Sequence, residues 1–208
     1  MTKRAALMLA LMEPPPGLEE EFADWYDTEH LPQRRGLPGF VNGMRWVALE
    51  GFPKSLASYD LASLDALADP AYLAVSGANS TPWSRRLLAR TARAGRMRVE
   101  VEQIWPGTAT FLPPRKTARL LAARYADVPV QQQQAFADAA NALAKTLPGL
   151  AQLRVFAGVR DAATELWVLM EFGAPVTLSM LAPVLGRIAG YGADVFNLYA
   201  PYDRDALR

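Results

Sequence analysis

The segment from Phe22 to Pro32 combines ionisable and aromatic side chains at helical spacing. His30 is the only histidine among 208 residues, and it directly follows Glu29. In an ideal helix, with about 100° per residue, Phe22, Trp25 and Glu29 fall within one apolar stripe and His30 lies at its edge, about 100° further round. A carboxylate on such a face needs a partner or a raised pKa. The segment therefore predicts a small-molecule pocket beside this helix.

A carboxylate and an imidazole in adjacent positions suit proton transfer near neutral pH. In this hypothesis His30 moves the proton, Glu29 orients or charges the imidazole ring, and Tyr26 donates a hydrogen bond to a developing oxyanion. The helix should end around Glu29 or His30, because the residue before Pro32 disfavours helical geometry. The residues expected to bind substrate are Phe22, Trp25, Arg45, Trp83 and Arg86.

A structural alternative stays open for the same segment. In that alternative Glu29 is an ion-paired anchor for Arg34, Arg35 or Arg45 and holds the loop that follows. His30 is then a capping residue on the surface of the protein.

A second cluster comprises Asp69-Pro-Ala-Tyr72 and the run Asn79 to Arg86. Thr81 before Pro82 predicts a helix start, with proline at the first helical position. Trp83 and Arg86 are three residues apart and share one face of that helix. They either cover the mouth of a cavity or pack as ordinary surface residues.

The composition of the chain argues against several classes of function. The chain is 51% hydrophobic and 21% charged, as is usual for a globular protein, and its net charge of +1 recruits neither nucleic acid nor an anionic membrane. The absence of cysteine excludes disulfides and thiolate chemistry and fits a cytoplasmic location. With a single histidine we expect no metal site. We interpret a run of arginines as a solvated face: Arg85, Arg86, Arg90, Arg93, Arg96 and Arg98.

The chain also contains one pattern twice. In the first half, strands are expected at 5–12, 41–50, 57–62 and 97–105, with helical segments at 18–31 and 64–92. In the second half, strands are expected at 118–125, 151–160, 165–172 and 194–200, with helices at 130–147 and 176–189. This order predicts an α+β fold of two ferredoxin-like repeats, whose antiparallel sheets pack face to face into an α/β barrel with the helices outside. The expected domains are a first repeat at 1–106 that carries the pocket, a linker at 107–117 and a degenerate second repeat at 118–208.

The second half provides an internal control. Aligning Phe22-Ala-Asp with Phe136-Ala-Asp places Leu143 opposite Glu29 and Ala144 opposite His30. Because one copy of the helix is apolar at these positions, the fold does not require the polar pair. We therefore interpret the pair as an addition to the fold.

The motif Phe22-x-x-Trp-Tyr-x-x-Glu-His-x-Pro32, followed by Pro38-Gly-Phe40, resembles the dimeric α/β-barrel superfamily, in particular EthD-like and related uncharacterised proteins. Asp69-Pro-Ala-Tyr72 and Thr81-Pro-Trp83 are similar to segments of the same group. The resemblance covers roughly residues 5 to 105, and the second half matches only in its order of elements. Most members carry one unit per chain and pair as dimers, so here the partner is expected to be built in as a tandem repeat, which leaves a further homodimer open.

This superfamily includes muconolactone-type isomerases, polyketide cyclases, cofactor-free monooxygenases and haem-dependent enzymes. The resemblance implies a cofactor-independent enzyme of the isomerase, cyclase, lyase or monooxygenase type. Its ligand would be a small apolar acid, lactone or polyketide-like compound, and His30, Glu29 and Tyr26 would carry the chemistry. Two alternatives remain: a non-catalytic ligand-binding or stress-related protein, and a haem protein with His30 as ligand.

Overall fold

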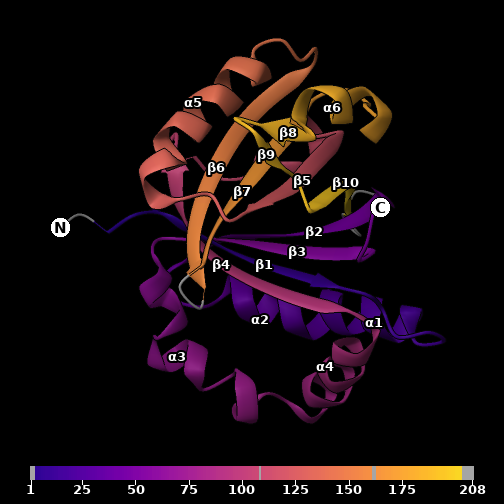
Figure 1. Cartoon of the computed structure of the whole chain (residues 1–208). Helices are drawn as coiled ribbons and strands as arrows, with labels where there is room; N and C mark the ends of the chain where they lie inside the picture. The colour runs from indigo at the N-terminus through magenta and orange to yellow at the C-terminus, as the bar shows by residue number, and fades with distance from the viewer. Residues whose placement is uncertain (1–2, 108, 161–162, 203–208) are drawn as a thin grey trace.

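The computed structural model describes residues 3–107, 109–160 and 163–202. Eight long strands form a closed antiparallel barrel in the order β1-β3-β2-β10-β5-β7-β6-β4 (Figure 1). The strands are β1 (Ala6–Met12), β2 (Phe40–Glu50), β3 (Ser55–Leu61), β4 (Arg96–Trp105), β5 (Arg119–Ala126), β6 (Leu150–Arg160), β7 (Ala163–Phe172) and β10 (Val195–Tyr202). Closure leaves none of these strands as an open edge.

Each half of the chain contributes one four-stranded sheet with the same internal order. The first is β4-β1-β3-β2 and the second is β10-β5-β7-β6. The edge strands of the two sheets pair with each other, β2 with β10 and β4 with β6, and this pairing closes the barrel. The predicted α+β class, with two ferredoxin-like repeats forming an α/β barrel, is confirmed.

The helices lie outside the barrel in two groups on opposite sides (Figure 1). One group contains α1 (Glu19–Trp25), the short segment η1 (Tyr26–His30), α2 (Leu31–Arg35), α3 (Pro70–Leu73) and α4 (Pro82–Ala94). The other contains α5 (Gln133–Ala144) and α6 (Leu178–Leu185). Within the described residues, none of these helices is long and apolar enough to cross a bilayer.

Alternation along the strands separates two apolar layers. On β1, Leu7, Leu9 and Leu11 point into the barrel, where they meet Trp46, Phe156 and other buried side chains. The intervening Met8 and Met12 point outward and pack against the first group of helices. Because successive side chains of a strand face opposite sides, one strand serves both layers. The cavity beside His30 lies in the outer layer, between the sheet and the first helices.

The connection between the two halves is fixed to the barrel by buried charges. Phe111 is buried, and its backbone N–H donates to Asp60, which also pairs with Arg154 at 2.7 Å. The next backbone N–H, that of Leu112, donates to Glu171, whose pKa burial raises. The segment expected as a linker is therefore attached to both sheets, and the domain boundaries at 106 and 118 stay a prediction.

Two predicted helical regions besides the first helix differ from the structure. The helix expected at 176–189 ends at Leu185, because Ala189 and Gly190 take positive φ angles of 49° and 89° and turn the chain into a two-stranded hairpin. Its strands are β8 (Arg187–Ile188) and β9 (Tyr191–Gly192). The stretch expected at 64–92 divides into η2 (Leu64–Leu67), α3, η3 (Gly77–Asn79) and α4. The predicted start of α4 is confirmed, since the Thr81 hydroxyl accepts the backbone N–H of Ser84 at 3.0 Å.

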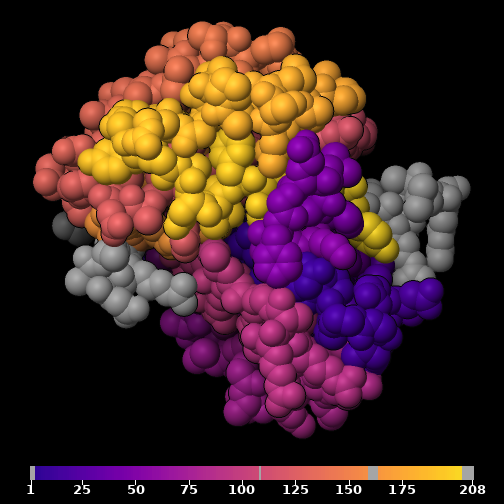
Figure 2. Space-filling model, turned by 45° about the vertical axis from the view of Figure 1, so that its right-hand side comes forward, coloured from indigo at the N-terminus to yellow at the C-terminus, as the bar shows by residue number. Residues whose placement is uncertain are grey.

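The two halves also touch at the turn between β2 and β3. Asn197 of β10 donates its amide to the carbonyl of Phe52 at 2.7 Å, and Glu50 accepts the backbone N–H of Leu178 at 3.0 Å. In Figure 2 this part of the first half reaches upward over the yellow C-terminal strand. The halves are thus joined beyond the barrel strands themselves.

Candidate functional site

The helix that carries His30 does not end at His30, as the sequence predicted, but continues to Arg35. It passes through one turn of π-helix, in which the backbone N–H of Leu31 bonds to the carbonyl of Tyr26, five residues back. Pro32 has no N–H to donate, so a helix passing through it must lose one backbone bond. A widened π-turn just before the proline accommodates this loss, and such turns recur at functional sites.

The π-turn also exchanges the expected orientations of Glu29 and His30. A π-bulge amounts to one extra residue in a helix, so every later residue lags by about 100° relative to ideal α geometry. His30 therefore takes the inward position that the helical wheel assigned to Glu29. The structure agrees, since His30 is only 8% exposed while Glu29 is half-buried at the side of the helix.

His30 is an uncharged imidazole in an aromatic environment. Its ring lies 4.4 Å from the Trp25 ring and 5.3 Å from the Tyr26 ring, measured between centroids. Burial, and then the charges of Arg34 and Arg96, lower the pKa of His30 to about 3. Nδ1 is fully buried without a hydrogen-bond partner among the described residues. His30 is thus a neutral group whose Nδ1 takes no part in the hydrogen bonds of the described residues.

Glu29 turns to α4 instead of facing His30 across a cavity. Its carboxylate accepts hydrogen bonds from Thr81 at 2.5 Å and Ser84 at 3.1 Å. The Ser84 hydroxyl also accepts the indole N–H of Trp25 at 3.0 Å. The structural alternative expected Glu29 to pair with an arginine, and this was wrong. The partners of Glu29 are the hydroxyl groups of Thr81 and Ser84. Glu29 anchors the N-terminal turn of α4.

Tyr26 and Arg45 belong to a neighbouring buried cluster. Arg45 forms an ion pair with Asp27, and the Tyr202 hydroxyl donates to the same carboxylate at 3.1 Å. The guanidinium of Arg45 lies over the ring of Tyr26, at 4.8 Å from its centroid. The Tyr26 hydroxyl lies against that of Tyr59, and burial raises the pKa of Tyr26 well above its ordinary value. Both hydroxyls are buried without a hydrogen-bond partner among the described residues, and Tyr26 stays protonated at neutral pH.

Trp83 and Arg86 share one face of α4, as their spacing predicted, and both contact Glu21. The indole N–H of Trp83 donates to the Glu21 carboxylate at 2.9 Å, and Arg86 forms an ion pair with it. This contact links α4 to α1 on the outside of the molecule. Phe22, by contrast, is fully buried between Trp25 and Tyr26. None of the three lies at the His30 cavity.

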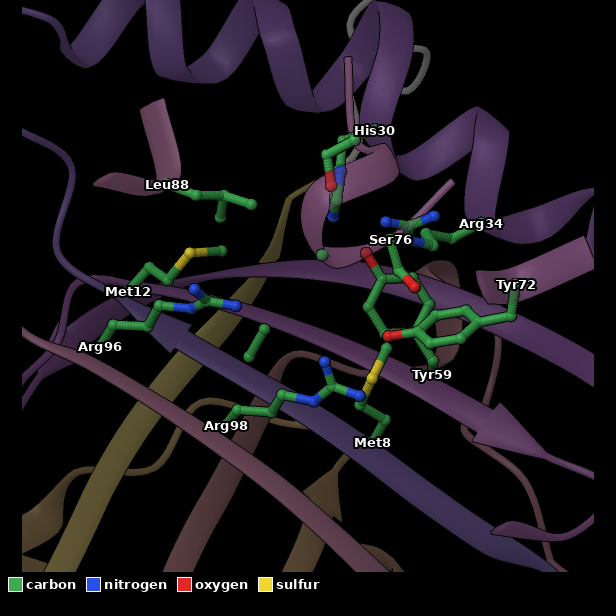
Figure 3. Close-up of a pocket in the computed structure, with 13 residues that line it drawn as sticks. Met8, Met12, His30, Arg34, Tyr59, Tyr72, Ser76, Leu88, Arg96 and Arg98 are labelled. Carbon is green, nitrogen blue, oxygen red and sulfur yellow. The ribbon is translucent and has the colours of Figure 1, made fainter. Parts of the chain in front are cut away.

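The cavity beside His30 lies between the helices and the outer face of the sheet and has a volume of about 60 Å³. Figure 3 shows the His30 ring pointing into it from the helix, with Arg34, Arg96 and Arg98 arranged around it. The lining residues are Met8, Ala10, Met12, His30, Arg34, Tyr59, Tyr72, Ser76, Gly77, Ser80, Leu88, Arg96 and Arg98. Among the described residues, the lining contains no carboxylate.

The arginines of this cavity were not among the site residues predicted from the sequence. The run ending in Arg96 and Arg98 was expected to be a solvated face, and Arg96 is indeed exposed while Arg98 is half-buried. The two residues are two apart in the strand β4, and both also line the cavity on the side of the helices. Arg34 follows His30 by four residues, a spacing that places both on one helix face. Two features of the sequence could therefore have identified these arginines: the four-residue spacing of Arg34 from His30, and the alternation of side chains along β4.

Three comparisons relate the chain to known proteins. No protein-family model matches it, and no curated protein matches it in sequence. Among solved structures, an anthrone oxidase-like protein superposes with a TM-score of 0.57 at 14% identity over 97% of this chain and 92% of the other. A heme-binding protein from Thermus thermophilus gives 0.53 at 15% identity over 99% and 94%. A structure described as a candidate chlorite dismutase gives 0.59 at 11% over 97% and 96%. These likenesses show a shared fold.

Haem does not fit the residues around His30. The cavity of about 60 Å³ is well below the roughly 300–1,000 Å³ of pockets that enclose drug-sized ligands. One face of the imidazole is occupied by Trp25, and the barrel interior is filled by large apolar side chains. The His30 site is therefore suited to a much smaller group.

Proposed function

We propose that the protein binds a small organic molecule in the His30 cavity and transfers a proton on it without a cofactor, as an isomerase, cyclase or lyase. The observation that carries the proposal is a buried, neutral imidazole that lines a cavity and whose Nδ1 has no hydrogen-bond partner among the described residues. Such a group is costly for stability and is a candidate for chemistry. The fold's solved neighbours, an oxidase-like protein and a heme-binding protein, also point to small ligands.

In the proposed reaction His30 accepts a proton from a carbon next to a carbonyl group of the substrate and returns it to another atom of the same molecule. Tyr59 lines the cavity, and burial raises its pKa well above the ordinary value, so it stays an O–H donor. It can stabilise the oxyanion that forms when the carbon loses its proton. Tyr26 supports Tyr59 from behind, and Glu29 fixes the helix that carries His30.

The wider organisation belongs to the same proposal. We take the chain as a tandem repeat of an EthD-like unit, with the site in residues 1–106, a linker at 107–117 and a structural unit at 118–208. Both units have the same strand order, which supports this division. A cytoplasmic location and a further homodimer also remain proposals.

The test is hydrogen–deuterium exchange at carbon. Small carboxylic acids, lactones and β-diketones are incubated with the protein in D₂O, and loss of C–H signal is followed by NMR. His30→Gln should lower the exchange rate by about 10²- to 10⁴-fold, the usual contribution of a general base. Tyr59→Phe should lower it, whereas Tyr125→Phe, which alters a buried tyrosine of the second half, should not. Equal rates in the His30→Gln variant would exclude His30 as the base.

A binding-only function is the second candidate, because Glu29 is engaged by Thr81 and Ser84 and does not form an acid–imidazole pair with His30. It predicts that a compound of the panel shifts the NMR signals of His30 but exchanges no carbon-bound proton above the rate in buffer.

A further inference from the structure

Three arginines surround the His30 cavity, from two different elements. Arg34 comes from α2 and is 4% exposed, while Arg96 and Arg98 come from β4. Arg34 donates to the carbonyl of Val75 at 3.1 Å and to the side chain of Gln33 at 3.3 Å. Among the described residues, neither Arg34 nor Arg96 forms an ion pair with a carboxylate.

Arg98 is only partly neutralised. Its Nε lies 2.5 Å from a carboxylate oxygen of Glu100, and both side chains are well exposed, at 38% and 42%. Screening by water makes such an exposed contact weak. The cavity therefore retains an excess of positive charge close to a buried guanidinium.

The charges around the cavity repel one another. Burial, together with the nearby Arg98, holds the pKa of Arg34 below its ordinary value. Burying a cation without an anion is unfavourable, and a positively charged neighbour adds to the cost. An anion of matching size would remove both penalties and would form charge-assisted hydrogen bonds with the guanidinium groups.

The size and walls of the cavity narrow the class of anion. A volume of about 60 Å³ admits only a group of a few heavy atoms, far smaller than a drug-sized ligand. A carboxylate with its adjoining carbon fits this space. Met8, Met12 and Leu88 give the cavity apolar walls, which favour a carbon-bearing anion over a fully hydrated inorganic ion.

We propose that Arg34, Arg96 and Arg98 bind the carboxylate of a small organic acid and hold its adjoining carbon against His30. This rests on the proposed function, for which it names the substrate class. Arg34 is the fixed anchor, because the Val75 carbonyl and the Tyr72 ring, 5.2 Å away, hold its guanidinium in place. Arg96 is exposed and supplies a positive charge on the solvent side of the cavity.

Binding of the carboxylate also makes His30 a better base. The groups that face His30 are Arg34 from α2, Arg96 and Arg98 from β4, Tyr59 from β3, Tyr72 from α3 and Tyr26 from η1. All of the charged groups among them are cations. A bound carboxylate offsets the charges of Arg34 and Arg96, which add to the effect of burial in lowering the pKa of His30. Proton abstraction is thereby coupled to the presence of the acid.

The test uses the fact that the chain has one histidine. The ¹³C-labelled imidazole of His30 is followed by NMR while sodium acetate is added at constant ionic strength. We expect saturable shifts of its signals and a rise of its pKa by one unit or more. Inorganic phosphate is the second probe and should bind at least tenfold more weakly. Tighter binding of phosphate than of acetate, or no saturable effect of acetate, overturns the proposal.

A neutral probe separates this inference from the proposed function. If γ-butyrolactone shifts the His30 signals and acetate does not, the cavity binds small molecules but the carboxylate class is wrong. If neither probe shifts them, both ideas fail.

The arginines are tested with a matched pair of variants. Arg96→Gln removes an exposed charge at the cavity, and Arg90→Gln removes an exposed charge on the outside of α4. Arg96→Gln should raise the dissociation constant of acetate about three- to tenfold, because it removes a partly solvent-screened, charge-assisted contact. Arg90→Gln should raise it by less than about twofold, because a distant charge is screened. Equal effects of the two variants contradict the assignment. Arg34→Lys, which keeps the charge but not the planar donors, should weaken acetate binding further.

Discussion

The helix that begins with Glu19 and the helix α5 occupy equivalent places over the two sheets, but they are packed differently. In α5 the inward side chains Phe136, Ala140 and Ala144 are all buried in a continuous apolar cluster. In the first half, the inward side chains are Phe22, Tyr26 and, after the extra residue of the π-turn, His30, and a cavity adjoins the last of them. The same fold is thus stable with either packing, which shows that the polar site is not required for folding.

The difference extends to the backbone. α5 is a regular α-helix that ends after Ala144, whereas the first helix contains the π-turn and continues through Pro32. Only this continuation places Arg34 at the cavity. The first half therefore differs from the second by a backbone irregularity as well as by its side chains, and both serve to bring His30 and Arg34 to one wall.

The largest expected contrast is in stability. Phe136→Ala should lower the free energy of unfolding by about 3–5 kcal/mol, because it opens a void in a closely packed cluster. His30→Leu should stay within about 1 kcal/mol of the unchanged protein, since an apolar group of similar size replaces a buried nitrogen without a partner. Urea denaturation measures both. A loss of about 3 kcal/mol or more in His30→Leu would show that His30 is a structural residue like Phe136.

The second contrast is in the dependence of stability on pH. The pKa of His30 is about 3 in the folded protein and about 6.5 when unfolded, so below pH 6.5 the unfolded chain binds a proton that the folded chain does not. This contribution is fully present above pH 6.5 and is lost as the pH falls toward 3, by up to about 1.4 kcal/mol per pH unit. Between about pH 6 and 4 the unchanged protein should therefore lose more stability than His30→Leu, in which only the carboxylates titrate. Parallel curves for the two proteins would contradict a buried neutral imidazole.

The fold was predictable from the sequence because hydrophobic periodicity repeats in the two halves and the turns carry proline and glycine. The site was predictable only in part. The pair Glu29-His30 identified the correct helix, but the π-turn rotates His30 inward and Glu29 sideways, and helical-wheel reasoning assumes a regular helix. Arg96 and Arg98 face the cavity only because β4 lies beside β1 under this helix, a long-range pairing that local patterns do not reveal.

The comparison can also be tested by moving the histidine to the second half. Ala144→His introduces an imidazole at the position that the gap-free alignment of the two helices matches with His30, where the side chain is 3% exposed and packs within the apolar cluster. Overpacking should lower the free energy of unfolding by about 1–3 kcal/mol. Ala144→Leu is the control for volume without polarity. If Ala144→His is as stable as the unchanged protein, the second half is less closely packed than the apolar cluster indicates.

The smallest effect is expected for Glu29→Gln. This variant distinguishes a structural role of Glu29 from a role in the protonation of His30. Glu29→Gln keeps an acceptor oxygen for the hydroxyls of Thr81 and Ser84, so it should lower the free energy of unfolding by less than about 1 kcal/mol, whereas Glu29→Ala removes both bonds and should cost about 1.5–3 kcal/mol. Because the carboxylate faces α4, neither variant should change the pKa of His30 in the NMR titration. A clear fall of that pKa in Glu29→Gln, at unchanged stability, would mean that Glu29 charges the imidazole after all and that the acid–base pair first expected from the sequence forms in solution.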